Sequence, residues 1–135
     1  MNCKHVDHIG IAVKNLDESI KFYEEVLGLK CYAIEEVKEQ KVRTAFFKAG
    51  DTKIELLEST APDGAIARFI EKKGEGIQHI AFAVDSVETA LSDASAKGVQ
   101  LIDKQPRDGA EGMSIAFLHP KSTFGVLTEL CEKKK

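Results

Sequence analysis

The stretch His8-Ile9-Gly10-Ile11-Ala12-Val13 decides the fold, because a second version of it occurs later in the chain as His79-Ile80-Ala81-Phe82-Ala83-Val84. Four of the six positions are identical, at an offset of 71 residues. Both stretches are rich in isoleucine, valine or phenylalanine, which favour β-strands. Each stretch therefore predicts an apolar strand that opens on a histidine.

Two further matches follow in the same order. Ala45-Phe46-Phe47 aligns with Ala116-Phe117-Leu118 at the same offset, and Glu55-Leu56-Leu57-Glu58 aligns with Glu129-Leu130-Cys131-Glu132 at an offset of 74 residues. Three ordered matches with one small change of length indicate an internal duplication. The chain is predicted to consist of two copies of one structural unit.

Each copy is expected to begin with a strand, at about 6–13 or 77–84, and to continue into a helix. Both helices have a capping residue and a glycine at the end, namely Asn15 or Asp17 with Gly28, and Ser86 with Gly98. Three more strands are expected in each copy, at about 30–37, 42–49 and 52–58, and at about 99–104, 113–118 and 125–131.

The resulting plan is a pair of tandem βαβββ modules in a single α+β domain that covers residues 1–135. Module one spans about 5–59, a linker helix about 62–73, and module two about 76–132. Each four-stranded sheet would carry its helix on one face and leave the other face free. We expect a curved, eight-stranded mixed sheet around a cleft, with the helices on its outer face.

Strand alternation decides which side chains reach that cleft. In the first strand, His8 shares a face with two small residues, while the bulky Ile9, Ile11 and Val13 face the helix. His79 occupies the same position in the second copy. In the last strand of each module, apolar neighbours turn inward and leave Glu55 and Glu129 on the cleft face.

The four residues His8, Glu55, His79 and Glu129 therefore form two symmetric pairs that are predicted to hold a divalent metal. A carboxylate in a half-buried cavity is costly unless it is paired or bound to a metal. Two imidazoles and two carboxylates suit a borderline first-row ion such as Co²⁺, Ni²⁺, Mn²⁺ or Zn²⁺. A six-coordinate ion would keep two positions for water or a chelating substrate.

The composition excludes several other classes of protein. The 135 residues include 19 Lys and Arg against 22 Asp and Glu, so the net charge of −3 gives no basic field for nucleic acid. No apolar run is long enough to span a membrane, and the N-terminus lacks the apolar core of a signal peptide. Cys3, Cys31 and Cys131 show no pairing pattern, which favours reduced thiols in a cytoplasmic protein. We expect Cys131 to be a buried small residue.

The paired plan and its ligand set resemble the vicinal oxygen chelate superfamily, which includes glyoxalases, bleomycin resistance proteins and dioxygenases. The resemblance covers essentially the whole chain and is most specific for the methylmalonyl-CoA epimerase family. The stretches that carry it are 7–13, 53–57, the linker-helix stretch 66–70 with 76–81, and His119-Pro120-Lys121 with 125–130. Epimerases often have two adjacent histidines where this chain has Gln78-His79, and often glutamine where it has Glu55.

The resemblance implies an isomerase that takes and returns the C2 proton of a 2-methylmalonyl-CoA thioester through a metal-stabilised enediolate. Glu129 is the first candidate base and Glu55 the second, both being ligands as well. A non-ligand carboxylate on the strand near Arg43-Thr44-Ala45 is another option in the family, but this chain has no acid there. The resemblance also makes a homodimer plausible.

Other functions remain open at this point. Glu55 matches bacterial glyoxalase I, a lyase that uses the same metal and base chemistry on a hemithioacetal. A metal-free module that sequesters small molecules is the alternative from another class. A ring-cleaving iron dioxygenase would need two histidines and one glutamate, and the additional Glu55 argues against it. His119 is expected in a surface turn, with contact to substrate as the alternative. For each of Lys48, Lys104, Arg107 and Lys121 the expectation is a solvated charge, with contact to a phosphate as the alternative.

Overall fold

The computed structural model describes residues 1–134, which divide into two compact units. The N-terminal unit is His8–Gln78, and the C-terminal unit combines Met1–Asp7 with residues 79–134. The first seven residues therefore belong to the unit that contains the second sequence copy. Each unit contains four paired strands and a helix packed against them, as the duplication predicts.

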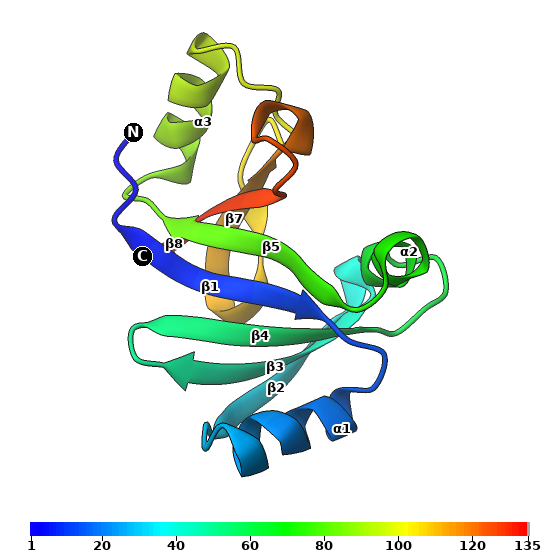
Figure 1. Ribbon diagram of the computed structural model, residues 1–135. Coiled ribbons are helices and arrows are strands. Elements are labelled where there is room, and N and C mark those ends of the chain that lie inside the picture. Colours follow the sequence, from blue (N-terminus) through cyan, green and yellow to red (C-terminus); the bar gives the residue numbers. More distant parts are fainter. Residues whose placement is uncertain (135) are drawn as a thin grey trace. The chain divides into compact units, whose positions relative to one another are not determined.

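The sheet of the N-terminal unit has the strand order β2-β3-β4-β1 (Figure 1). β1 and β4 are parallel, and the other two pairings are antiparallel. Its strands are β1 (His5–Ala12), β2 (Cys31–Val37), β3 (Val42–Ala49) and β4 (Thr52–Ser59), with a short 3₁₀ turn, η2 (Lys38–Gln40), between β2 and β3.

Helix α1 (Leu16–Lys21) continues as a π-helical turn, η1 (Phe22–Val26), and packs against β3 and β4 (Figure 1). Asn15 caps the helix as expected, and Gly28 follows the turn with a φ of +72°, which glycine adopts without steric cost. The buried residues beneath α1 come from one face of the sheet and form the first core cluster: Val13, Leu16, Ala45, Phe47 and Leu56. Strand alternation predicted that Val13 and Leu56 face the helix, and this prediction is confirmed.

Helix α2 (Ala65–Lys73), the expected linker helix, packs on the opposite face of the same sheet. Its Ile66 lies in a cluster with Ala12 and Leu57, and Phe69 and Ile70 pack against them. Because strand side chains alternate, Leu57 is on the same face as Glu55, and Ala12 on the same face as His8. Helix α2 therefore covers one end of the face that carries these two residues.

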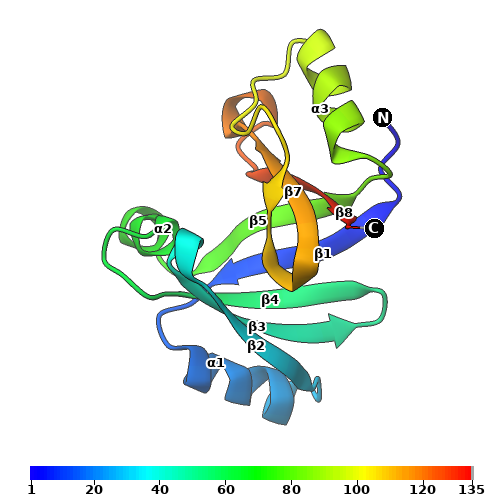
Figure 2. The same ribbon diagram turned by 180° about the vertical axis from the view of Figure 1, so that it is seen from behind.

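The sheet of the C-terminal unit has the strand order β5-β8-β7-β6. Figure 2 labels β5, β7 and β8 of this sheet. β5 and β8 are parallel, and the remaining pairings are antiparallel. Its elements are β5 (Gly76–Ala83), α3 (Val87–Ala96), β6 (Arg107–Asp108), η3 (Ala110–Gly112), β7 (Met113–Leu118), η4 (Pro120–Ser122) and β8 (Thr128–Lys133). Helix α3 begins after the predicted cap Ser86 and packs against β7 and β8.

The expected strand at 99–104 is wrong. This segment makes one isolated bridge, Leu101 with Leu118, and the edge strand is only the two-residue β6. The cause is Asp103: its side chain accepts a hydrogen bond from the Phe117 N–H at 2.8 Å, while its own N–H and that of Ile102 both donate to the Phe117 carbonyl. These bonds hold the backbone of Ile102 and Asp103 against Phe117, and residues 99–104 therefore do not form a regular strand ladder.

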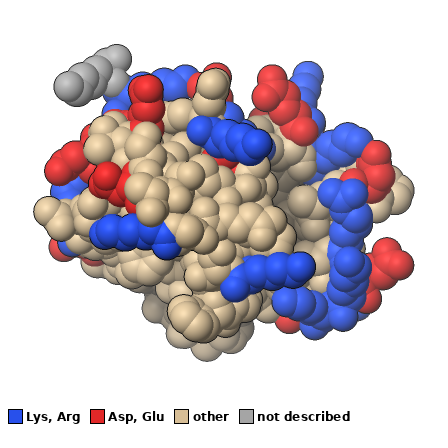
Figure 3. Space-filling model, turned by 90° about the horizontal axis from the view of Figure 1, so that it is seen from above, with Lys and Arg blue, Asp and Glu red and all other residues tan. Residues whose placement is uncertain are grey.

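Charged side chains of both signs lie side by side on the face of the protein seen in Figure 3, in keeping with the small net charge. In the C-terminal unit, the N-terminal amine of Met1 donates a hydrogen bond to Asp93 on α3 at 2.8 Å. That bond, with the positive charge of the amine, lowers the pKa of the Asp93 carboxyl. Among residues 1–134, none of the helices combines the length and apolar character that a membrane crossing requires.

Candidate active site

The N-terminal unit holds a buried histidine–glutamate pair. His8 Nδ1 lies 3.3 Å from Glu55 Oε2, and the two residues are 5% and 6% exposed. β1 and β4 bring them together in parallel register, in which Glu55 is opposite Gly10. Gly10 lies two residues after His8, so both side chains emerge on the same face of the sheet.

The C-terminal unit holds the equivalent pair. His79 Nε2 lies 3.4 Å from Glu129 Oε1, and the residues are 5% and 4% exposed. The parallel register of β5 and β8 places Glu129 opposite Ala81, again two residues after the histidine. The sequence duplication is therefore reproduced as a duplicated local geometry, strand by strand.

Each pair also has a phenylalanine beside its glutamate. Phe46 on β3 is opposite Glu55, and Phe117 on β7 is opposite Glu129. The two phenylalanines are themselves equivalent positions of the repeat. In both units the imidazole and the carboxylate thus share one face of the sheet with a phenylalanine side chain.

The donor atoms of each pair fit a divalent metal. One imidazole nitrogen and one carboxylate oxygen, both withdrawn from water, point toward each other within each unit. Burying a carboxylate is costly unless a cation or hydrogen-bond donors compensate for it. Imidazole and carboxylate together are ligands that Co²⁺, Ni²⁺, Mn²⁺ and Zn²⁺ accept.

In the N-terminal unit, the edge strand β2 covers the ring of Phe46. The Tyr32 ring lies 5.9 Å from the Phe46 ring, and Lys48 Nζ lies 5.8 Å from the Tyr32 ring. Phe46 is fully buried. The long edge strand therefore places an aromatic ring, Tyr32, against the phenylalanine beside Glu55.

One acidic residue on this face was missed by the sequence reasoning, which considered only the strand that contains Thr44. Glu35 on β2 is directly opposite Thr44 on β3, so both side chains share a face. Phe46, two residues from Thr44, is opposite Glu55, and Glu35 is therefore on the Glu55 face of the same sheet. Finding it required the register between β2 and β3.

In the C-terminal unit, a cation, Arg107, covers the equivalent ring of Phe117 instead. The Phe117 ring lies edge-on to His79 with ring centroids 5.7 Å apart, and Arg107 Cζ lies 5.4 Å from the Phe117 ring. Arg107 Nε is also 3.2 Å from Asp103 Oδ1. Arg107 thus contacts the same aromatic ring that packs against His79.

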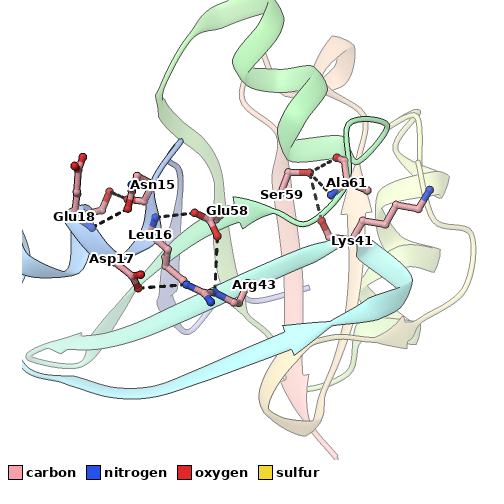
Figure 4. Close-up of polar contacts among 10 residues, drawn as sticks. Asn15, Leu16, Asp17, Glu18, Lys41, Arg43, Glu58, Ser59 and Ala61 are labelled. Atoms are coloured by element: carbon pink, nitrogen blue, oxygen red, sulfur yellow. Dashed lines mark hydrogen bonds and ion pairs between the residues drawn. The ribbon is translucent and has the colours of Figure 1, made fainter.

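The last glutamate of each repeated stretch has a structural role. Glu58 accepts a hydrogen bond from the Leu16 N–H at the start of α1, and Glu132 accepts one from the Val87 N–H at the start of α3, both at 2.9 Å. Figure 4 shows the first of these contacts, next to the Asn15 cap and the ion pairs of Arg43 with Asp17 and Glu58. A carboxylate stabilises a helix at this end because it satisfies free N–H groups and opposes the dipole.

Two further predictions are confirmed outside the pairs. His119 is in a turn, where its Nδ1 accepts a hydrogen bond from the Lys121 N–H at 3.1 Å. Cys131 is fully buried in a cluster with Ala81, Met113 and Ile115, as expected for a small core residue.

Comparisons with known proteins extend these observations. Residues 7–117 match the model of the glyoxalase/bleomycin resistance protein/dioxygenase superfamily. The chain is 50% identical to the uncharacterized protein YqjC of Bacillus subtilis over 96% of this chain and 92% of that protein. It is 35% identical to the mitochondrial methylmalonyl-CoA epimerase of Homo sapiens, over 96% of this chain and 74% of that protein.

A solved structure agrees with the fold. A single-residue variant of the Streptomyces coelicolor methylmalonyl-CoA epimerase, in complex with 2-nitronate-propionyl-CoA, matches with a TM-score of 0.94 and 39% identity, covering 98% of this chain and 96% of the other. The chain therefore belongs to the glyoxalase/bleomycin resistance protein/dioxygenase superfamily. The predicted α+β fold with paired βαβββ modules is confirmed.

Proposed function

We propose that this protein is a methylmalonyl-CoA epimerase, an isomerase that interconverts the two C2 epimers of a 2-methylmalonyl-CoA thioester. The observation that carries the proposal is the pair of buried histidine–glutamate contacts at equivalent positions of the two sequence copies. Similarity to named epimerases along nearly the whole chain supports the substrate class.

His8, Glu55, His79 and Glu129 would together hold one divalent ion, with Co²⁺ favoured. The ligand types suit this ion, and Ni²⁺, Mn²⁺ or Zn²⁺ would fit the same set. A divalent ion held there supplies Lewis-acid stabilisation of the negative charge that develops on the substrate oxygens. Homodimer formation and a cytoplasmic location stay predictions.

Side chains of the protein must accept and return the C2 proton of the substrate. Epimerisation breaks the C2–H bond on one face, transfers the proton to a base, and returns a proton to C2 on the opposite face. Glu129 is the first candidate base, because it is a buried carboxylate beside His79. The electron pair left at C2 delocalises into the thioester carbonyl until the second proton arrives.

The second face of C2 needs a second proton carrier. Glu55 is one candidate, although a carboxylate that is also a metal ligand is a weaker base. Glu35 is the other candidate, because strand register puts it on the same face without making it one of the four ligands. These two carboxylates can be separated by substitution.

The test is an NMR experiment in D₂O with metal-loaded protein and (2R)- or (2S)-methylmalonyl-CoA. Metal-dependent exchange of the C2 proton for deuterium, with appearance of the other epimer, is the expected result. Turnover of the methylglyoxal–glutathione adduct without C2 exchange would replace the proposal by glyoxalase I, which the acid at position 55 favours. Metal analysis that finds no bound ion would contradict both enzymes.

The metal-free binding module makes a different prediction. Small-molecule binding would then persist in His8→Ala and His79→Ala. For the epimerase, both variants lose the metal and the C2 exchange, whereas His5→Ala retains both. His5 is a suitable control because it is an exposed residue of the same strand as His8.

A further inference from the structure

We propose that Arg107 is a substrate-binding residue that holds an oxyanion of the acyl-CoA, either the free carboxylate of the acyl group or a phosphate of coenzyme A. The inference rests on the proposed function, because it names the group that recognises that substrate. It starts from the contact between Arg107 and Phe117 in the C-terminal unit.

Phe117 connects Arg107 to the His79–Glu129 pair. Its backbone is opposite Glu129 in the β7–β8 ladder, so its ring emerges on the face of Glu129. The same ring contacts His79 edge-on, at 5.7 Å between centroids, and Arg107, at 5.4 Å from Cζ to the ring centroid. The guanidinium and the imidazole therefore contact the same aromatic ring.

Asp103 fixes the orientation of Arg107. One carboxylate oxygen of Asp103 lies 3.2 Å from Arg107 Nε, and the other accepts the Phe117 N–H at 2.8 Å. The Asp103 side chain is 17% exposed and that of Arg107 is 44% exposed. The ion pair engages Nε, and the exposed part of the guanidinium can donate to an incoming anion.

The chemistry of the guanidinium fits this role. A guanidinium donates two parallel hydrogen bonds to a carboxylate or phosphate, and stacking on an aromatic ring restricts its rotamers before the anion arrives. In the N-terminal unit, Tyr32 covers Phe46 at the equivalent place. The substrate would thus be oriented by the C-terminal unit.

The test compares Arg107→Gln with the matched control Lys104→Gln. Lys104 belongs to the same segment but lines a groove with Ser92 and Ser95 of α3. We expect Arg107→Gln to raise the KM for methylmalonyl-CoA by about tenfold to a hundredfold, with little change in kcat. Arg107→Lys should recover part of the loss, and Lys104→Gln should behave as the wild type.

Calorimetric Kd values of the metal-loaded protein identify the anion. A loss for methylmalonyl-CoA, but not for propionyl-CoA or coenzyme A, assigns Arg107 to the carboxylate; an equal loss for all three assigns it to a phosphate. Either result supports the inference. If the wild type exchanges the C2 proton but Arg107→Gln binds all three compounds as the wild type does, the inference is overturned. If the wild type does not exchange the C2 proton, the proposed function is overturned, and the inference with it.

Discussion

The two sequence copies have kept the same histidine, glutamate and phenylalanine but have surrounded them differently. In the N-terminal unit, the seven-residue β2 covers Phe46 with Tyr32 and carries Glu35 on the same face. In the C-terminal unit, the edge strand is reduced to two residues, and Arg107 covers Phe117. The two copies thus share a histidine, a glutamate and a phenylalanine but differ in their edge strands, which carry an acid, Glu35, in the N-terminal unit and a cation, Arg107, in the C-terminal unit.

The first prediction asks whether both units are needed. His8→Ala and His79→Ala should each remove the stoichiometric metal and lower the C2 exchange rate by at least about a hundredfold, because each deletes a proposed metal ligand and loss of an outer-shell partner alone costs about 10–100-fold. Metal analysis and NMR exchange measure the two effects. A variant that retained its metal would show that one unit binds the ion without the other.

The second prediction separates the two glutamates. Glu129→Gln should lower kcat by about 10²–10⁴-fold, because the amide cannot accept the C2 proton. Glu55→Gln should keep the metal and lose only about tenfold, because an amide oxygen can replace the carboxylate as a ligand. Steady-state kinetics with metal analysis give both numbers. Equal losses would mean that the copies share the proton transfer equally.

The third prediction concerns the acid on β2. Glu35→Gln should lower exchange by about ten- to a hundredfold if it carries the second proton. Glu36→Gln is the matched control, because the neighbouring residue faces the opposite side of the sheet. Exchange should be followed from each epimer separately, since loss of one base affects the two directions of labelling differently. Identical behaviour of Glu35→Gln and Glu36→Gln would remove Glu35 from the mechanism.

The fourth and smallest effect concerns the glutamates at the helix starts. Glu132→Gln should lower the free energy of unfolding by about 0.5–1 kcal/mol, because the charge that opposes the dipole of α3 is lost. Glu58→Gln should cost slightly more, because Glu58 also lies 3.8 Å from Arg43. Denaturant unfolding measures both, and kcat should stay unchanged. A large loss of activity would place these residues in the site.

Most of the fold could be predicted because the periodic signals are local. The boundaries 42–49 and 113–118 are those of β3 and β7, and Ser86 caps α3 as expected. The failure at 99–104 had a non-local cause, since the hydrogen bonds of Asp103 to Phe117 redirect the chain. A propensity pattern cannot report a bond between residues on different elements.

The sequence by itself determined the duplication, the two βαβββ plans and the parity that puts each histidine on the same face as a glutamate, because these depend on spacing alone. Only the tertiary structure decided the partners across strands. In the tertiary structure, Glu35 is opposite Thr44 and Arg107 contacts the ring of Phe117. Glu58 and Glu132 accept hydrogen bonds from the first N–H groups of α1 and α3. Register and edge-strand length set those contacts, and both arise from packing between distant segments.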